Sequence, residues 1–322
     1  MSVPTNGLPA FGGIRVPLGE QLIDWGYAAG WQLVRTMPEF AARNVFDAGA
    51  LYAARGGGPE QLRKNLSRVL GVSPAEVPGS VIRASLASYA RYWREAFRLP
   101  SMNQRTLGER LRHCLLGTEH IHAGLERGNG VILALPHSGN WDMAGVAVVH
   151  QFGKFTTVAE RLKPESLYQR FVEYRESLGF EILPLTGGAR PPVEVLAERL
   201  RDNRIICLMA DRDLSRNGVQ VNLFGEATRM PAGSAKLAID TGATLVTVHC
   251  WNEPDDWVFQ ISPPVDTSGA DVTVITQDLA DLFQAGIAAH PADWHMLQPQ
   301  WLADLSAERR AHLAGEKRAE DT

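Results

Sequence analysis

A histidine and an aspartate at short spacing are the first residues in this chain that could do chemistry. His137 and Asp142 form the pattern H-x-x-x-x-D directly after the apolar run Val131–Leu135. An imidazole is the side chain best suited to remove a proton near neutral pH, and a carboxylate on one ring nitrogen fixes its tautomer. We therefore expect His137 to act as a general base toward a substrate hydroxyl and Asp142 to orient it.

The spacing alone can also arise by chance. With nine histidines, a chain of this composition contains about 0.5 such pairs by chance. A structural histidine is therefore the alternative to a catalytic one. The small residues Ser138 and Gly139 would keep space open beside the imidazole, which favours the catalytic interpretation.

A second group of charges follows the apolar run Ile205–Ala210. Charges at the end of a buried strand rarely stay unpaired. One interpretation is a second carboxylate near His137 with an arginine that binds phosphate, and the other is a salt-bridged loop. Glu226, further along, either orients a sugar hydroxyl or His137, or braces that loop. The charges that follow Ile205–Ala210 are Asp211, Arg212 and Asp213.

These residues need a scaffold that brings the ends of different strands together. From residue 128 onward, short apolar runs alternate with helical periodicity, which predicts an α/β fold with a mainly parallel central sheet flanked by helices. The predicted strands are Val131–Leu135, Phe155–Ala159, Glu181–Leu185, Arg204–Ala210, Val219–Phe224, Thr244–Trp251 and an antiparallel Val258–Ser262. The predicted helices are Asn140–Gln151, Pro164–Leu178, Pro192–Asp202, Pro231–Thr241 and Thr273–His290.

The first 127 residues predict helices instead. Helical spacing links Leu22 to Met37, and further helices are expected at Glu39–Arg55, Pro74–Arg98 and Thr106–Arg127. No linker separates this region from the rest. We therefore expect one domain over residues 1–322, made of a helical region (1–127), an α/β catalytic core (128–305) and a tail (306–322).

Composition excludes several function classes. The 322 residues are 45% hydrophobic and 21% charged, as in an ordinary soluble globular protein. The net charge of −4 gives no reason to expect nucleic-acid binding. Three scattered cysteines predict neither a disulfide framework nor a metal site. No membrane span or signal peptide is predicted, so we expect a cytoplasmic location, soluble or peripheral.

The charge is unevenly distributed along the chain. Residues 1–113 carry +6 and residues 114–322 carry −10. Arginines and aromatic rings on helices suit an anionic membrane surface, although a helical layer with core aromatics and solvated arginines explains them as well. The aromatic residues of this region are Trp25, Tyr27, Trp31, Phe40, Phe46, Tyr52, Tyr89, Tyr92, Trp93 and Phe97.

The H-x4-D pair resembles the signature of glycerolipid acyltransferases, and the likeness extends over residues 60–302. It resembles the bacterial branch that contains the lipid A lauroyl and myristoyl transferases, with departures at Leu223 and Ser234. Two N-terminal stretches, Asp24–Trp31 and Phe46–Gly57, are similar to the actinobacterial acyltransferases of phosphatidylinositol mannosides. The motifs that carry the likeness are His137–Asp142, Tyr174–Gly179, Asp211–Asp213, Gly218–Glu226 and Met230–Ala235.

The resemblance implies transfer of a palmitoyl group from acyl-CoA to a mannose hydroxyl, the 6-hydroxyl of the mannose on the inositol 2-position. It implies catalytic roles for His137, Asp142, Asp211 and Glu226, with no metal and no cofactor beyond the acyl-CoA co-substrate. A peripheral enzyme on the cytoplasmic face of the plasma membrane is expected. The expected substrate-binding residues are Arg175 or backbone N–H groups at Ser138–Asn140 for the oxyanion, Arg212 and Asp213, and Trp141 in an acyl-chain groove.

Three other functions stay open on the sequence. The same chemistry could act on another glycolipid acceptor, such as a lipid A precursor. A lipid-binding module could keep the groove without catalysis, and a thioesterase would release free fatty acid. The chain has no G-x-S-x-G, P-loop, H-E-x-x-H or dinucleotide-binding motif, which disfavours the enzyme classes that use them.

Overall fold

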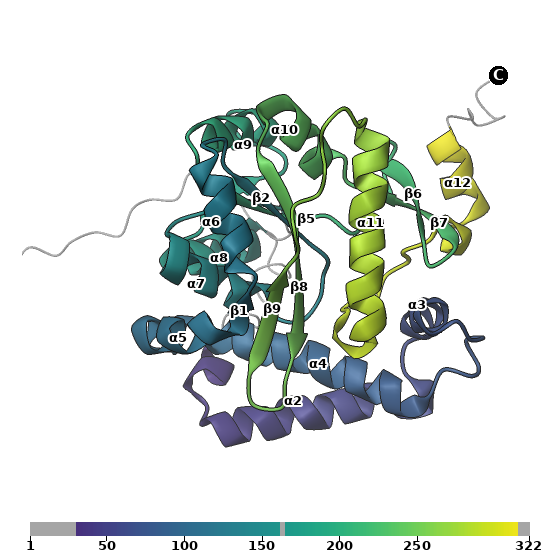
Figure 1. Ribbon diagram of the computed structural model, residues 1–322. Coiled ribbons are helices and arrows are strands. Elements are labelled where there is room, and N and C mark those ends of the chain that lie inside the picture. Colours follow the sequence, from purple (N-terminus) through teal and green to yellow (C-terminus); the bar gives the residue numbers. More distant parts are fainter. Residues whose placement is uncertain (1–29, 162–164, 315–322) are drawn as a thin grey trace, which may run out of the picture.

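A seven-stranded sheet runs through the centre of the protein, in a computed structural model that describes residues 30–161 and 165–314. Its order is β1-β9-β8-β2-β5-β3-β4, and β9 runs antiparallel to β8, which confirms the predicted mainly parallel α/β sheet (Figure 1). The strands are β1 Leu115–Leu116, β2 Val131–Leu135, β3 Thr156–Ala159, β4 Glu181–Pro184, β5 Ile205–Met209, β8 Thr244–Asn252 and β9 Trp257–Ile261.

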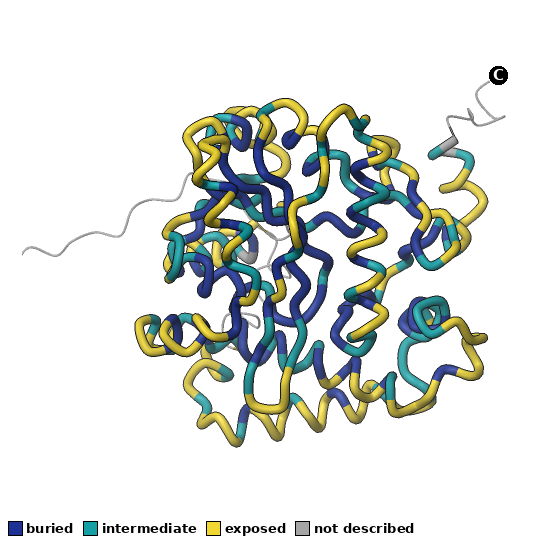
Figure 2. The backbone as a smooth tube through the Cα atoms, viewed as in Figure 1, coloured by how far each residue is buried: buried dark blue, intermediate teal, exposed yellow. Residues whose placement is uncertain are grey.

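Helices cover both faces of the sheet because its strands are apolar on both sides. In β2, Val131, Leu133 and Leu135 belong to one buried cluster, and Ile132 and Ala134 belong to the other. Figure 2 shows the strands as the buried centre of the molecule. The first cluster contains α5 Gln104–Leu111, α6 Thr118–Glu126, α7 Trp141–Phe152 and α8 Glu165–Ser177; the second contains α9 Pro192–Arg201, α10 Gly233–Thr241 and α11 Val272–Ala289.

The N-terminal region is helical, as predicted. Helix α2 (Glu39–Ala53) lies along α4 (Gly79–Arg98), and α3 (Glu60–Leu70), which the sequence analysis did not anticipate, lies near α11 (Figure 1). Helix α4 begins later than predicted because Pro78 occupies its N-cap in an extended conformation. The described helices include none that is long and apolar enough to cross a membrane. The first half of the predicted helix at residues 22–37 lies outside the described residues, and residues 30–36 are helical as predicted.

The prediction of one helix over residues 106–127 is wrong. Helix α5 ends at Leu111, and a short strand precedes α6. Gly117 breaks the helix with a φ of +78°, and a Cβ atom there would lie 2.5 Å from the carbonyl oxygen of Ile261. Only a glycine allows the backbone to approach β9 this closely. The chain therefore pairs with β9 as strand β1, although its sequence pattern there still looks helical.

A two-stranded hairpin and a C-terminal segment complete the described fold. Strands β6 (Val219–Leu223) and β7 (Glu226–Met230) form the hairpin, of which the sequence analysis predicted only the first strand. After α11, residues 291–301 return along the core to the loop that follows β2. Helix α12 (Ala307–Ala314) follows, and the end of the predicted tail lies outside the described residues.

Candidate active site

A short polar contact at the sheet edge joins His137 to Asp211. Strands β2 and β5 are parallel neighbours with Leu135 opposite Met209, so the loops that follow them begin side by side. The imidazole Nδ1 of His137 lies 2.6 Å from Oδ1 of Asp211, and the His137 backbone N–H donates to Oδ2 at 2.9 Å. The His137 side chain is 38% exposed and that of Asp211 is 1% exposed. Asp211 is therefore enclosed by the protein, whereas the imidazole of His137 is accessible to solvent.

Each partner alters the acidity of the other. Burial disfavours the charged imidazolium, but the charge and the hydrogen bond of Asp211 outweigh burial and raise the pKa of His137. Burial would raise the pKa of Asp211, but His137 and further N–H donors outweigh it and lower that pKa. Asp211 is therefore a carboxylate at neutral pH, and His137 is a stronger base than a free imidazole.

The prediction that Asp142 orients His137 is wrong. Asp142 lies in the first turn of α7 and accepts two hydrogen bonds from Arg175, from Nε at 2.9 Å and from a terminal nitrogen at 3.3 Å. The hydroxyl of Tyr92 donates to the same carboxylate at 3.1 Å. Helix α7 starts at Trp141 and directs Asp142 toward α8, whereas His137 still belongs to the loop beside β5. Short spacing in sequence therefore does not produce contact here.

Two of the expected substrate-binding residues are fully buried and already occupied. The Ser138 hydroxyl accepts from the backbone N–H of Cys250, and Asn140 caps α7 while donating to Glu95. The backbone N–H groups of Ser138 and Gly139 donate to backbone carbonyl groups. These two N–H groups cannot also bind an oxyanion, so the structure contradicts that expectation for Ser138, and it gives Asn140 a structural contact instead.

The remaining predicted residues brace loops around the site. Glu226 forms an ion pair with Arg68 at 2.9 Å, so its loop-bracing interpretation fits the structure. The Nε of Arg212 donates to the carbonyl oxygen of Pro299 at 2.9 Å. Asp213 accepts from the backbone N–H of Ser215 within its own turn. Of the charges after β5, Asp211 is the one that hydrogen-bonds to His137.

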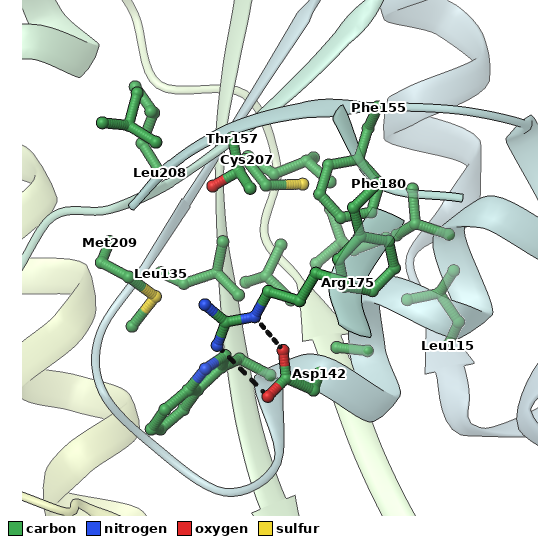
Figure 3. A pocket seen from close by; sticks show the side chains of 18 residues that line it. Leu115, Leu135, Asp142, Phe155, Thr157, Arg175, Phe180, Cys207, Leu208 and Met209 are labelled. Atoms are coloured by element: carbon green, nitrogen blue, oxygen red, sulfur yellow. Dashed lines mark hydrogen bonds and ion pairs between the residues drawn. The ribbon is translucent and has the colours of Figure 1, made fainter. Parts of the chain in front are cut away.

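An apolar cavity adjoins the His137–Asp211 pair. The empty space among its lining side chains, its open part included, measures about 680 Å³ between the sheet and helices α7 and α8 (Figure 3). Trp141 lines it and also packs edge-on against His137, with ring centroids 5.6 Å apart. The apolar lining includes Leu115, Leu135, Phe155, Phe180, Cys207 and Met209. An apolar cavity thus lies where the acyl-chain groove was expected, with Trp141 in its wall.

Arg175 is the cationic group of this cavity. Burial disfavours its charge, but Asp142 outweighs burial and raises the pKa of Arg175. The guanidinium uses Nε and one terminal nitrogen on Asp142, and its other terminal nitrogen points away toward Met209 and Leu135 (Figure 3). This arrangement leaves N–H donors inside an otherwise apolar cavity, as stabilisation of a developing oxyanion requires.

Sequence reasoning missed Tyr92, Glu95 and Trp294 as parts of the site. Glu95 accepts from Asn140 and from Trp257, and so holds the start of α7. Trp294 donates to Asp211. All three come from segments distant in sequence, and only an apolar helical face at Tyr92 gave any signal. Among the described residues, no group of three His, Cys, Asp or Glu side chains is arranged to hold a metal ion.

The chain resembles known proteins over most of its length. Residues 15–303 match the family model described as bacterial lipid A biosynthesis acyltransferase. The chain is 70% identical to the phosphatidylinositol mannoside acyltransferase of Mycolicibacterium smegmatis, over 93% of this chain and 98% of the relative. It is 66% identical to the phosphatidylinositol mannoside acyltransferase of Mycobacterium tuberculosis (strain CDC 1551 / Oshkosh), over 90% and 92%.

The matched region contains the sheet, the His137–Asp211 pair and the apolar cavity together. From the family match and the identity to its relatives, the chain belongs to the bacterial lipid A biosynthesis acyltransferase family, and it is an acyltransferase.

Proposed function

We propose that the protein transfers a palmitoyl group from acyl-CoA to the 6-hydroxyl of the mannose on the inositol 2-position of phosphatidylinositol mono- and dimannosides. The names of relatives at 66–70% identity support the acceptor class. The observation that carries the chemistry is the contact of His137 with Asp211 beside an apolar cavity. The donor, the position and the mechanism are part of the proposal.

In the proposed step, His137 is the general base. Asp211 occupies Nδ1, so Nε2 is the ring nitrogen that faces the acceptor hydroxyl. His137 takes the hydroxyl proton while the oxygen attacks the thioester carbonyl carbon. The tetrahedral intermediate then collapses, the carbon–sulfur bond breaks, and the CoA sulfur leaves with the proton held by His137. A positioned base contributes about 10²–10⁴-fold to such a step.

Arg175 would stabilise the negative charge that develops on the carbonyl oxygen. Its guanidinium stays charged and is held by Asp142, so its donors are oriented before the reaction starts. No covalent acyl-enzyme is needed, because the base activates the acceptor directly. The proposed role of Asp142 is therefore to orient Arg175, the oxyanion donor, and not the base His137.

The cavity would hold the acyl chain. Burial of a hydrocarbon chain contributes about 0.8 kcal/mol for each CH₂ group removed from water. The space runs from Asp142 and Arg175 to Leu115 and Phe180, so a thioester near the guanidinium would place its tail among apolar side chains (Figure 3). This arrangement supports a long-chain acyl donor.

Peripheral attachment to an anionic membrane, on the cytoplasmic face of the plasma membrane, is part of the proposal. Large apolar side chains on α2 face outward, including Phe40 (71% exposed) and Tyr52 (70% exposed). Arginines on and beside α2 would meet anionic headgroups. The outward apolar residues of this helix are Phe40, Val45, Leu51 and Tyr52.

The first experiment is acyl transfer from radiolabelled palmitoyl-CoA to purified phosphatidylinositol mono- or dimannoside. We expect an acylated lipid whose new ester maps to the mannose 6-hydroxyl by fragmentation mass spectrometry, and its loss in His137→Ala. Glu226→Gln is the matched control, because this residue pairs with Arg68 instead. Free palmitate without acylated lipid would indicate a thioesterase, and acylation of only another glycolipid would refute the acceptor class.

Membrane attachment is tested separately by co-sedimentation with vesicles of phosphatidylglycerol and phosphatidylcholine. We expect the wild-type protein to bind and the triple variant Phe40→Ser, Leu51→Ser, Tyr52→Ser to bind at least tenfold more weakly. Equal sedimentation of both proteins would contradict attachment through α2.

A further inference from the structure

The segment after α11 is fastened to the loop that carries His137. The backbone N–H of Gly139 donates to the carbonyl oxygen of Asp293 at 2.8 Å, and the N–H of His295 donates to the carbonyl oxygen of His137 at 2.8 Å. Ser138 and Trp294 face each other in an antiparallel bridge between these bonds. The backbone at His137 is therefore held on both sides by a segment more than 150 positions away in the sequence.

The side chain of Trp294 reaches past this loop to Asp211. Its indole Nε1 donates to Oδ2 of Asp211 at 3.2 Å, and this oxygen also accepts the backbone N–H of His137. Gln300, from the same segment, donates to the backbone carbonyl of Asp211 at 2.6 Å. The carboxylate thus has the imidazole on one oxygen and two N–H donors on the other, which fixes the plane in which it meets His137.

An indole is not needed there for packing alone. Trp294 is 1% exposed and packs edge-on against Trp301, with ring centroids 5.9 Å apart. Any large aromatic side chain would fill most of that volume. The feature that an indole adds is the N–H aimed at Asp211, a buried carboxylate that would otherwise lose a donor.

Few other charges act on His137. Asp211 and Arg212 face it from the loop after β5; Asp211 raises the pKa of His137 and Arg212 lowers it. His295 faces it from the segment after α11, and burial together with the charge on His137 lowers the pKa of His295 to about 3. His295 is therefore neutral whenever His137 titrates, which leaves Asp211 as the partner that sets the basicity of His137.

We propose that Trp294 is a positioning residue of the acyl transfer reaction: its indole N–H fixes the Asp211 carboxylate, and Asp211 in turn presents His137 to the acceptor hydroxyl. The proposal rests on the proposed function for its kinetic consequence. Its structural consequence, the control of His137 by Trp294, is independent of the substrate.

The test compares Trp294→Phe with Trp301→Phe in the full-length protein. Trp301 is a matched control, because it is fully buried in the same cluster and its Nε1 also makes one hydrogen bond, to the carbonyl oxygen of Leu223 at 2.9 Å. Both variants lose a buried indole N–H bond. Only Trp294→Phe removes a donor from Asp211.

The first readout is the pH dependence of His137 modification by diethyl pyrocarbonate, which reacts with the unprotonated ring and is followed by peptide mass spectrometry. Loss of the indole donor makes the Asp211 carboxylate a stronger partner for the imidazolium, so we expect the modification midpoint to move to higher pH in Trp294→Phe only. The second readout is acyl transfer. We expect kcat to fall about tenfold in Trp294→Phe with KM nearly unchanged, because a tenfold fall corresponds to the loss of about one charge-assisted hydrogen bond.

An unchanged midpoint in Trp294→Phe, or the same change in both variants, would overturn the proposal. A shifted midpoint with no acyl transfer by the wild-type protein would instead overturn the proposed function and leave the positioning role standing. If Trp294→Phe does not fold, benzothienylalanine at position 294 keeps the shape and replaces the N–H by sulfur. The same two readouts then decide.

Discussion

Nδ1 of His137 lies 2.6 Å from Oδ1 of Asp211, although 74 positions separate the two residues in the chain. The contact supports a base that depends on this one carboxylate. Asp211→Asn keeps the shape and removes the charge, so kcat should fall about 10²–10⁴-fold while the fold is retained. Steady-state acyl transfer and circular dichroism measure the two effects. A variant with wild-type kcat would exclude Asp211 as the orienting residue.

The same contact predicts a pH dependence. His137 must be neutral to accept a proton, and its pKa is raised because Asp211 outweighs burial. Activity should therefore fall as the pH drops through this raised pKa, above the ordinary histidine value of about 6.5. In Asp211→Asn, the acidic limb of kcat/KM should move to lower pH while the maximum falls. An acidic limb that stays in place would argue that another group titrates.

The buried pair of Asp142 and Arg175 predicts a loss of stability. Asp142→Asn leaves a guanidinium that is mostly buried without its counter-charge, which should cost about 3–5 kcal/mol in the free energy of unfolding. The double variant Asp142→Asn, Arg175→Gln should recover most of that stability without recovering activity, because the oxyanion donor is gone. Denaturant unfolding and acyl transfer on the same preparations distinguish the outcomes. Recovered activity in the double variant would refute the oxyanion role.

The cavity wall at Gly145 predicts a change in chain-length preference. A Cβ atom there would lie 2.5 Å from Cζ of Phe180, so Gly145→Ala must push the ring into the cavity that both residues line. We expect the kcat/KM ratio of palmitoyl-CoA to lauroyl-CoA to fall about tenfold, since each excluded CH₂ is worth about 0.8 kcal/mol. Gly233→Ala is the control, because its Cβ position has open space around it. Equal ratios in both variants would contradict the assignment of the acyl site.

His249 predicts an acid sensitivity unrelated to catalysis. Its imidazole packs against Gly286 and has no hydrogen-bond partner among the residues that the structure describes. Burial, then the nearby His290, lowers the pKa of His249 to about 4. Between pH 6.5 and 4 the unfolded chain binds a proton here that the folded protein does not, so stability is lost as the pH falls. At pH 5 the loss is about 2 kcal/mol. His249→Leu should remove this part of the pH dependence in unfolding experiments, and an unchanged slope would show that other groups cause it.

Much of the core could be predicted because each buried strand is a continuous apolar run. Val131–Leu135 is predicted and observed over the same residues, and the first turn of α7 follows where expected. Where a backbone contact overrides periodicity, prediction failed: Gly117 ends a helical pattern only because β9 approaches it, and β9 is distant in sequence.

The site was predictable in its residues and less so in its pairings. His137 and Asp211 both follow apolar strands, which marks them as edge residues, but their contact depends on β2 and β5 being neighbours in the sheet. Asp142 looked like the partner because it is near in sequence, and helix α7 turns it toward Arg175. Trp294 gave no signal, since its role depends on where a distant segment returns.

The return of the C-terminal segment to the loop at His137 has a consequence for how the protein is made. A ribosome delivers the loop at His137 early and residues 293–300 late, yet this late segment supplies hydrogen bonds to Gly139, to His137 and to Asp211. A nascent chain shorter than 300 residues therefore lacks the bonds that hold its base. We therefore expect acyl transfer to reach its full rate only after residues 293–300 have been synthesised and have packed against this loop.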